Sequence, residues 1–171
     1  MKLTETFRFE GSDGLTLDGR LDRPRDRKAL GTAIFAHCFT CGKDIRAASV
    51  IASKLADSGI AVLRFDFTGL GGSEGPLEGF SGNIDDLVAA ADALRARYQA
   101  PVLLVGHSLG GAAVIAAAER IAEVKAVATI GAPFEVDHVL DRLGEGRAAV
   151  EKKGVATVSI AGRPFRVTRD F

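Results

Sequence analysis

Short apolar runs alternate along the chain with longer segments whose apolar residues recur at helical spacing. The runs at 32–36, 60–65, 102–105 and 124–130 are typical of buried strands. The segments at 44–59, 83–98 and 112–121 carry apolar or alanine residues three and four positions apart, which is typical of helices. A repeated strand–helix order buries a parallel sheet between helices. The sequence therefore predicts an α/β fold, with a mostly parallel sheet and helices on both faces.

Both ends of the chain depart from this alternation. Residues 4–10 and 15–21 alternate polar and apolar side chains around a turn cluster, which predicts an N-terminal antiparallel hairpin. Past residue 133, a helix is predicted at 135–143, and a hairpin is predicted from strand patterns at 155–160 and 165–168. We expect these last elements to lie outside the main sheet. The predicted division is a core at 1–133 and a smaller segment at 134–171.

Composition excludes several classes of function. The 171 residues include 22 basic and 22 acidic side chains, so the chain lacks the basic surplus of a nucleic-acid binder. No apolar run is long enough to cross a bilayer, and the N-terminal residues, which include Glu5, do not form an apolar signal segment. We therefore expect a cytoplasmic enzyme or binding domain without a nucleic-acid or membrane partner.

The segment Gly106-His107-Ser108-Leu109-Gly110-Gly111 fits the pattern G-x-S-x-G and lies between a predicted strand and a predicted helix. On such a turn the backbone crowds its neighbours, and glycine at 106 and 110 removes the clash. The Ser108 hydroxyl is then expected above the sheet edge at a helix N-terminus, where N–H groups favour an oxyanion. The alternative is a glycine-rich turn that contains a serine by chance.

At these residues the chain resembles the α/β-hydrolase superfamily, over about residues 1–133. Two more motifs carry the resemblance. One is His37-Cys38-Phe39-Thr40, directly after a predicted strand. The other, from Arg64 to Ser73, resembles the R-x-D-x-x-G-x-G-x-S loop of lipases, esterases and serine aminopeptidases. The combination is most similar to the hydrolase half of bacterial fusion proteins that carry a C-terminal OsmC-like domain. The resemblance thus allows for an OsmC-like partner domain in a parent protein.

The resemblance implies roles for individual residues. Ser108 is the expected nucleophile, and the backbone N–H groups of Leu109 and Phe39 are the expected oxyanion-hole donors. Cys38 stands where the superfamily usually has glycine. Asp66 is expected to hold its own loop by hydrogen bonds. The implied substrate is a small-molecule carboxylic ester or related acyl compound, and no cofactor or metal is implied.

The chain has two cysteines, and Cys38 and Cys41 form a C-x-x-C pair. Two are too few for a disulfide scaffold, and a zinc site needs a second pair of ligands that the sequence does not offer. A redox dithiol beside the expected site is one alternative. We expect the other, which is a pair of reduced thiols in a packed loop.

A serine nucleophile needs a general base, which this superfamily places after the serine and after an acid. Of the three histidines, His138 alone follows Ser108. Its neighbour Asp137 is poorly placed to hold the imidazole, and Asp141, one helical turn away, is typical of a surface pair. We therefore expect His138 to be a lid or surface residue. The base and acid are then expected beyond residue 171, with the last strands of the sheet, and residues 134–171 form a partial lid.

The expected function is a serine hydrolase whose 171-residue chain on its own turns over esters poorly. One alternative is a catalytically incomplete binding or partner-dependent protein, and another is an acyltransferase on the same scaffold. A dehalogenase is disfavoured, because the enzymes of that kind carry aspartate at the position of Ser108. The histidines before the serine, His37 and His107, are expected to be structural. Four apolar residues are candidates either for an acyl pocket or for the core: Phe39, Phe67, Phe134 and Val136.

Overall fold

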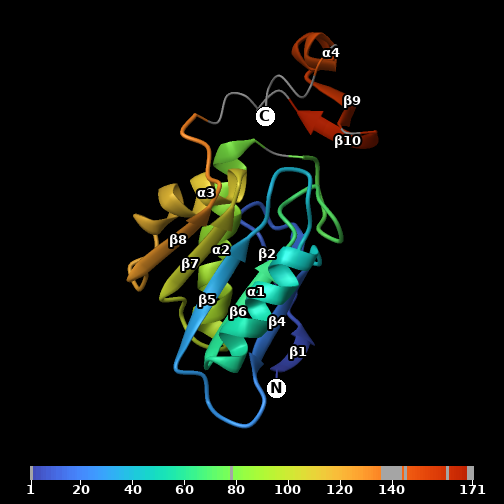
Figure 1. The fold of residues 1–171 in the computed structure, drawn as a ribbon. Coiled ribbons are helices and arrows are strands. Elements are labelled where there is room, and N and C mark those ends of the chain that lie inside the picture. Colours follow the sequence, from blue (N-terminus) through green and yellow to red (C-terminus); the bar gives the residue numbers. More distant parts are fainter. Residues whose placement is uncertain (1, 78, 136–143, 145, 161, 169–171) are drawn as a thin grey trace.

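The computed structural model describes residues 2–77, 79–135, 144, 146–160 and 162–168 (Figure 1). Its strands and helices follow the chain in the order β1 (Lys2–Thr6), β2 (Phe9–Glu10), β3 (Thr16–Leu17), β4 (Gly19–Pro24), β5 (Gly31–Ala36), α1 (Arg46–Asp57), β6 (Ile60–Phe65), α2 (Phe80–Arg97), β7 (Leu103–His107), α3 (Leu109–Ala118), β8 (Ala126–Ile130), α4 (Gly146–Lys153), β9 (Val155–Ile160) and β10 (Arg163–Thr168). The predicted strand–helix alternation is confirmed from β5 to β8.

A mostly parallel sheet forms the centre of the described part of the chain. Its strand order is β1-β4-β6-β5-β7-β8. Strands β6, β5, β7 and β8 run parallel to one another, and β4 and β1 extend the sheet antiparallel at one edge. The N-terminal hairpin is present. Its outer part pairs β1 with β4 from Lys2↔Pro24 to Thr6↔Arg20, and its inner part pairs β2 with β3.

Helices cover both faces of the sheet because the chain crosses the sheet in one direction from β5 to β6 and in the opposite direction from β6 to β7. The crossover through α1 runs from β5 to β6, and the crossover through α2 returns past β5 to β7. Right-handed crossovers in opposite directions place their helices on opposite faces. Accordingly, Ala48 and Ala52 of α1 pack in one apolar cluster with Phe35. Leu87 of α2 and Val114 of α3 belong to the cluster on the other face. Figure 1 shows α1 in front of the sheet and α2 and α3 behind it.

The N-terminal hairpin is tied to the centre of the sheet by a buried ion pair. Arg64 on β6, which is 4% exposed, donates from Nε to Oδ2 of Asp22 on β4 at 2.6 Å. The other oxygen of Asp22 accepts hydrogen bonds from Lys2 Nζ at 3.0 Å and from the Thr4 hydroxyl. Buried charges destabilise a fold unless they are paired in this way. The pairing thus fixes how β1, β4 and β6 lie side by side.

Three helix boundaries differ from the prediction. The first helix was predicted to begin at residue 44, where Asp44 has a side chain typical of an N-cap, but α1 begins at Arg46 and its cap position is Ile45. The Asp44 carboxylate instead accepts a hydrogen bond from Nη1 of Arg64 at 2.8 Å. Helix α2 begins at Phe80, three residues before the predicted start at Asn83. The alanine-rich helix α3 ends at Ala118 rather than near residue 121.

The C-terminal elements form a small module outside the main sheet. Strands β9 and β10 pair antiparallel from Arg163↔Ile160 to Thr168↔Val155, which confirms the predicted hairpin. The module contacts the core where the Leu77 N–H donates to the Arg166 carbonyl at 2.6 Å, and its residue Val167 belongs to the main apolar cluster. Helix α4 was not predicted, and most of the helix predicted at 135–143 lies outside the described residues. That residues 134–171 act as a partial lid stays a prediction.

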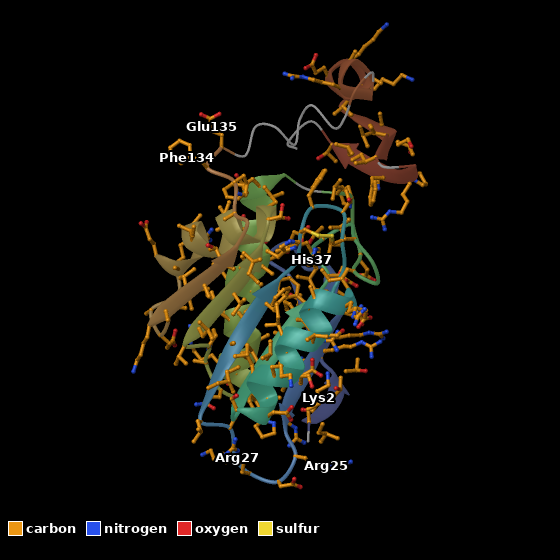
Figure 2. All side chains as sticks on the ribbon, viewed as in Figure 1. Lys2, Arg25, Arg27, His37, Phe134 and Glu135 are labelled. Atoms are coloured by element: carbon orange, nitrogen blue, oxygen red, sulfur yellow. A yellow bond between two sulfur atoms is a disulfide. The ribbon has the colours of Figure 1, made fainter. Side chains whose placement is uncertain are left out.

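Strand β8 is the exposed end of the sheet. All of its residues are exposed, and within the described part of the chain it pairs with β7 alone. The chain continues from β8 to Phe134, whose side chain is 100% exposed and points away from the fold in Figure 2. Apolar surface is therefore concentrated along this side of the sheet.

The ion pair predicts a large loss of stability for Asp22→Asn. The substitution removes the buried charge that pairs with Arg64 and leaves the buried guanidinium paired with the exposed carboxylate of Asp44, which costs up to about 3 kcal/mol in comparable cases. Urea unfolding followed by circular dichroism measures the change. The control is Asp85→Asn, which breaks an exposed pair with Arg120 and is expected to cost less than about 1 kcal/mol. Equal losses in the two variants would contradict the prediction.

The same pair predicts a pH dependence. Burial alone would raise the pKa of the Asp22 carboxyl, but hydrogen bonds from Arg64, Thr4 and Lys2 outweigh burial and hold the pKa below its usual range. A carboxyl with a depressed pKa in the folded state stabilises the fold above its unfolded pKa of about 4 and loses that contribution as the pH falls further. The difference in unfolding free energy between wild type and Asp22→Asn is therefore expected to shrink between about pH 5 and pH 2.5. A difference that stays constant with pH would contradict this.

Candidate active site

The candidate site lies at the carboxyl ends of the neighbouring strands β5 and β7. The helix that follows β5 lies on one face of the sheet, and the helix that follows β7 lies on the other. The two loops diverge there, and in open α/β sheets the crevice at such a point is the usual position of ligand sites. His37 to Gly42 follow β5, and Ser108 follows β7. The topology therefore brings two of the sequence motifs to one place.

Ser108 occupies the turn between β7 and α3 in a strained backbone conformation. Its φ is 53° and its ψ is −125°, a region that residues with a side chain rarely adopt. Its N–H donates to the Ile130 carbonyl at 2.9 Å, and its carbonyl accepts from the Gly111 N–H at 2.8 Å. Neighbours on β8 and α3 thus hold the turn. The strand, turn and helix that the G-x-S-x-G pattern requires are all present.

The glycines of this motif allow unusually close backbone packing. A Cβ on Gly106 would lie 2.6 Å from Cα of Gly111, and a Cβ on Gly110 would lie 2.6 Å from the Ala36 carbonyl oxygen. The His37 carbonyl oxygen is even closer to that second position. Real side chains do not tolerate such distances, so glycine is required at both positions. The first turn of α3 is therefore packed directly against the end of β5, where the loop with Phe39 begins.

His37 is buried, and both nitrogens of its ring are occupied. Nδ1 lies 2.8 Å from the Cys38 carbonyl, and Nε2 accepts from the Phe67 N–H at 3.4 Å. Burial lowers the pKa of His37, although the bond to Cys38 and the charge of Asp66 oppose this shift. The ring is thus neutral, with its proton on Nδ1. His37 holds two loops together, as expected for a structural residue, and Figure 2 shows it below the disulfide that follows β5.

The structure orients the two N–H groups that the sequence assigned to an oxyanion hole. Leu109 is the first residue of α3, and the first N–H groups of a helix have no partner within the helix. The N–H of Phe39 shares a peptide unit with the Cys38 carbonyl, which is held by His37 and by the Cys41 N–H at 3.0 Å. The carbonyl and N–H of a trans peptide point in opposite directions. Anchoring the Cys38 carbonyl therefore fixes the direction of the Phe39 N–H.

The expectation of two reduced thiols is wrong. Cys38 and Cys41 form a disulfide, with their Cα atoms 5.3 Å apart. The physical reason is the tight turn between them, which the hydrogen bond from the Cys41 N–H to the Cys38 carbonyl closes. This turn brings the two Cα atoms within the range that a disulfide spans. The sequence shows the C-x-x-C spacing. It does not show the turn that brings the two cysteines close enough to form a disulfide.

A buried cluster of charges supports the loop on its outer side. Asp66, which follows β6, accepts hydrogen bonds from the backbone N–H and the Nζ of Lys43, both at 2.6 Å, and from the Gly72 N–H at 2.9 Å. Lys43 Nζ also lies 2.6 Å from Oδ2 of Asp18. Burial alone would lower the pKa of Lys43, but the two carboxylates outweigh it and raise the pKa. Lys43 therefore stays charged, and Asp66 has the loop-holding role expected of it.

Sequence reasoning did not identify Lys43 and Asp18 as part of this support. Lys43 lies three residues after the second motif and Asp66 lies within the third, so a basic residue near one motif and an acidic residue in the next were the available signal. Asp18 comes from the N-terminal hairpin, and nothing in the local pattern connects it with either motif. Its pKa is lowered, chiefly by the hydrogen bond from Lys43. Three distant segments thus meet at one ammonium group.

The described residues do not place a general base beside Ser108. His107 directly precedes the serine, is half-buried, and has an Nδ1 atom that makes no hydrogen bond within the described part of the chain. His138, Asp137 and Asp141 lie outside the described residues. The base and acid expected beyond residue 171 stay a prediction.

The three candidate pocket residues that the structure describes have different surroundings. Phe67 is buried in the core, with its ring 5.2 Å from that of Phe65, and Phe134 is fully exposed. Phe39 packs against the main apolar cluster, and Val136 lies outside the described residues. For Phe67, core packing is therefore the correct interpretation.

The described residues contain neither a metal-binding cluster nor a helix that could span a membrane. No group of three or more His, Cys, Asp or Glu side chains there is arranged to hold a metal ion. None of the described helices combines the length and apolar character needed to cross a membrane.

Comparison with known proteins gives the family. The model of the family described as serine aminopeptidase, S33, matches residues 33–161. A comparison with curated proteins gave no match. Among solved structures, the esterase domain of a Rhodothermus marinus protein is 48% identical, covers 96% of this chain and has a TM-score of 0.72. A serine hydrolase without a lid from Xanthomonas campestris is 29% identical over 76% of this chain, with a TM-score of 0.68.

A third solved structure, an esterase from Pyrococcus furiosus, is 22% identical over 82% of this chain and shares its fold with a TM-score of 0.73. The chain spans 65%, 62% and 56% of the lengths of these three structures. The family match covers most of the chain, and the fold and motifs described above agree with it. The chain therefore belongs to the serine aminopeptidase S33 family of α/β hydrolases.

Proposed function

We propose that the protein is a serine hydrolase that cleaves a carboxylic ester or related acyl bond through Ser108. The observation that carries the proposal is the backbone of Ser108, held at φ 53° between a strand and a helix N-terminus. Strain of this kind on a residue with a side chain persists where the surroundings enforce it, and it is concentrated at functional sites. The esterase domain from Rhodothermus marinus, at 48% identity, supports an ester as the substrate class.

In the proposed mechanism, the Ser108 hydroxyl oxygen attacks the carbonyl carbon and a tetrahedral oxyanion forms. The N–H groups of Leu109 and Phe39 stabilise this oxyanion, since one begins α3 and the other follows an anchored carbonyl. The dipole of α3 adds to this stabilisation at its N-terminus. A histidine and a carboxylate from beyond residue 171 are proposed as the general base and its orienting acid.

Residues 134–171 are proposed as part of a lid over this site. The supporting observation is the reach of the module toward the loop after β5, where Nη2 of Arg163 donates to the Thr40 carbonyl. Arg163 also lies over the ring of Phe165, 5.4 Å from its centroid. The module therefore contacts the same loop that carries the proposed donor Phe39.

The proposal predicts that Ser108→Ala abolishes hydrolysis. The protein expressed from its complete reading frame, whatever its length, is assayed with p-nitrophenyl acetate and labelled with a fluorophosphonate. We expect Ser108→Ala to lower kcat by about 10³-fold or more and to remove the label, because the attacking oxygen is gone. Ser58→Ala, at the far end of α1, is the control and should behave as wild type.

Three results would change the proposal. Undiminished hydrolysis by Ser108→Ala would refute Ser108 as the nucleophile. Strong hydrolysis by the 171-residue chain alone would refute a base and acid beyond residue 171. Efficient acyl transfer to an added alcohol in place of water would favour the acyltransferase alternative.

A further inference from the structure

The disulfide spans the turn that carries the proposed oxyanion donor. Cys38 and Cys41 are the first and fourth residues of this turn, with Phe39 and Thr40 between them. They are the only cysteines of the 171 residues, so the crosslink cannot exchange with another cysteine of this sequence. Both residues are half-buried, and Cys41 lines a cavity. The disulfide therefore lies where its reduction by an external reagent can change the candidate site.

Thr40 shows that this turn is held in a demanding conformation. Its φ is 57°, and a turn with positive φ at its third residue normally has glycine or asparagine there. Threonine is β-branched, so the same backbone costs it more than it costs other residues. The crosslink on one side and the Arg163 hydrogen bond on the other hold Thr40 in place. Without the crosslink, the preference of Thr40 for a negative φ favours opening of the turn.

The crosslink also connects directly to the Phe39 N–H. The Cys38 carbonyl, opposite that N–H in the same peptide unit, accepts its hydrogen bonds from His37 and from the Cys41 N–H. The second of these bonds closes the turn that the disulfide spans. If the turn opens, the Cys38 carbonyl keeps one anchor instead of two, and the direction of the Phe39 N–H is no longer fixed.

We propose that the Cys38–Cys41 disulfide is a reversible redox centre that positions the Phe39 N–H, so that the oxidised protein is the competent hydrolase. This inference rests on the proposed function. The disulfide is a positioning element, because it acts through Phe39 and does not touch the substrate. The reducing partner is a dithiol, which can complete the exchange without a third thiol in the protein.

A cavity gives such a dithiol access to one of the two sulfurs. The cavity has a volume of about 560 Å³ and is lined by Cys41, with Lys43 and Asp66 on the core side and Arg163 on the side of the C-terminal module. The charged side chains of this lining balance, with Lys43 and Arg163 as the cations and Asp44 and Asp66 as the anions. Cys38 does not line this cavity, so the geometry assigns Cys41 Sγ as the atom attacked.

The exchange is balanced in two steps. A thiolate of the dithiol attacks Cys41 Sγ, the Cys38–Cys41 bond breaks, and Cys38 leaves as a thiolate that takes up a proton. The second thiolate of the reagent then attacks the reagent sulfur that is bonded to Cys41 in the mixed disulfide. Cys41 is released as a thiolate and is protonated in turn. Two electrons and two protons pass from the dithiol to the protein, and the dithiol becomes a cyclic disulfide.

The kinetic test compares oxidised and reduced protein from the complete reading frame. The protein is reduced with dithiothreitol, freed of reagent by anaerobic gel filtration because thiols cleave p-nitrophenyl esters, and assayed at once. We expect kcat to fall about 10-fold, less than the 10²–10³ typical of losing an oxyanion donor outright, with KM changed less than about twofold. Reoxidation with oxidised glutathione should restore kcat.

The matched control is the double variant Cys38→Ser/Cys41→Ser. It should hydrolyse as slowly as reduced wild type and should be indifferent to dithiothreitol. Circular dichroism of each sample checks that the reduced protein remains folded. If oxidised and reduced wild type have the same kcat, or if the double variant matches the oxidised form, the inference is wrong while Ser108 still stands as the nucleophile.

A measurement that does not depend on hydrolysis separates this inference from the proposed function. The protein is labelled with ¹⁵N-phenylalanine, and the Phe39 amide signal is assigned from Phe39→Tyr. Reduction should shift this signal and accelerate its hydrogen exchange at least about 10-fold, because the turn opens. An unchanged Phe39 signal would refute the inference even in a protein without hydrolase activity. Absent hydrolysis in both redox states would refute the proposed function alone.

Discussion

The rest of the candidate site depends on the close approach of α3 to the end of β5. Gly110 has no side chain, so the helix lies directly against the carbonyl oxygens of Ala36 and His37. This contact sets the distance between the turn that carries Ser108 and the loop that carries Phe39. A protein interior is closely packed and does not stretch, so two loops joined in this way cannot drift apart independently. The geometry of the crevice is thus a property of the backbone more than of any side chain that lines it.

Around that contact, the fold uses buried charges to connect segments that are distant in sequence. Arg64 joins the N-terminal hairpin to the loop before α1, and Lys43 joins the same loop to Asp66 and Asp18. Each pair gives up much of its hydration, so such pairs contribute little net stability compared with apolar packing. They do exclude alternative arrangements, since any shift of one strand would leave a charge buried without its partner. The loops near the site are thereby kept in one arrangement.

The sequence predicted the fold well because its signals are local. Strand and helix periodicity, glycine turns and the G-x-S-x-G spacing each depend on neighbouring residues, and all of them agreed. The failures involved partners from elsewhere in the chain. Asp44 has the chemistry of an N-cap, but Arg64, 20 positions away, takes its carboxylate. Asp18 joined the Lys43 cluster without any local signal.

The cysteines and α4 illustrate two other limits. C-x-x-C spacing is compatible with thiols and with a disulfide, and the turn that decides between them rests on a hydrogen bond that composition does not reveal. Helix α4 is short and mostly polar, with Val150 as its buried residue, so it lacks the apolar stripe that a periodicity search detects. It is held by packing on β9, which is a tertiary signal. The expected general base stays a prediction, because none of the described residues provides it beside Ser108.

Strand β8 has a consequence for how the protein is handled and how it associates. No strand of the described part of the chain pairs with its outer edge, which offers backbone N–H and carbonyl groups beside the exposed side chains of Val127 and Ile130. Such an edge is a template for sheet extension by any further strand of matching register. The Ile130 carbonyl that holds Ser108 is already engaged on the β7 side, so a strand added outside β8 would lengthen the sheet without rearranging the turn. The molecule can therefore gain a strand at this edge while its crevice keeps its shape.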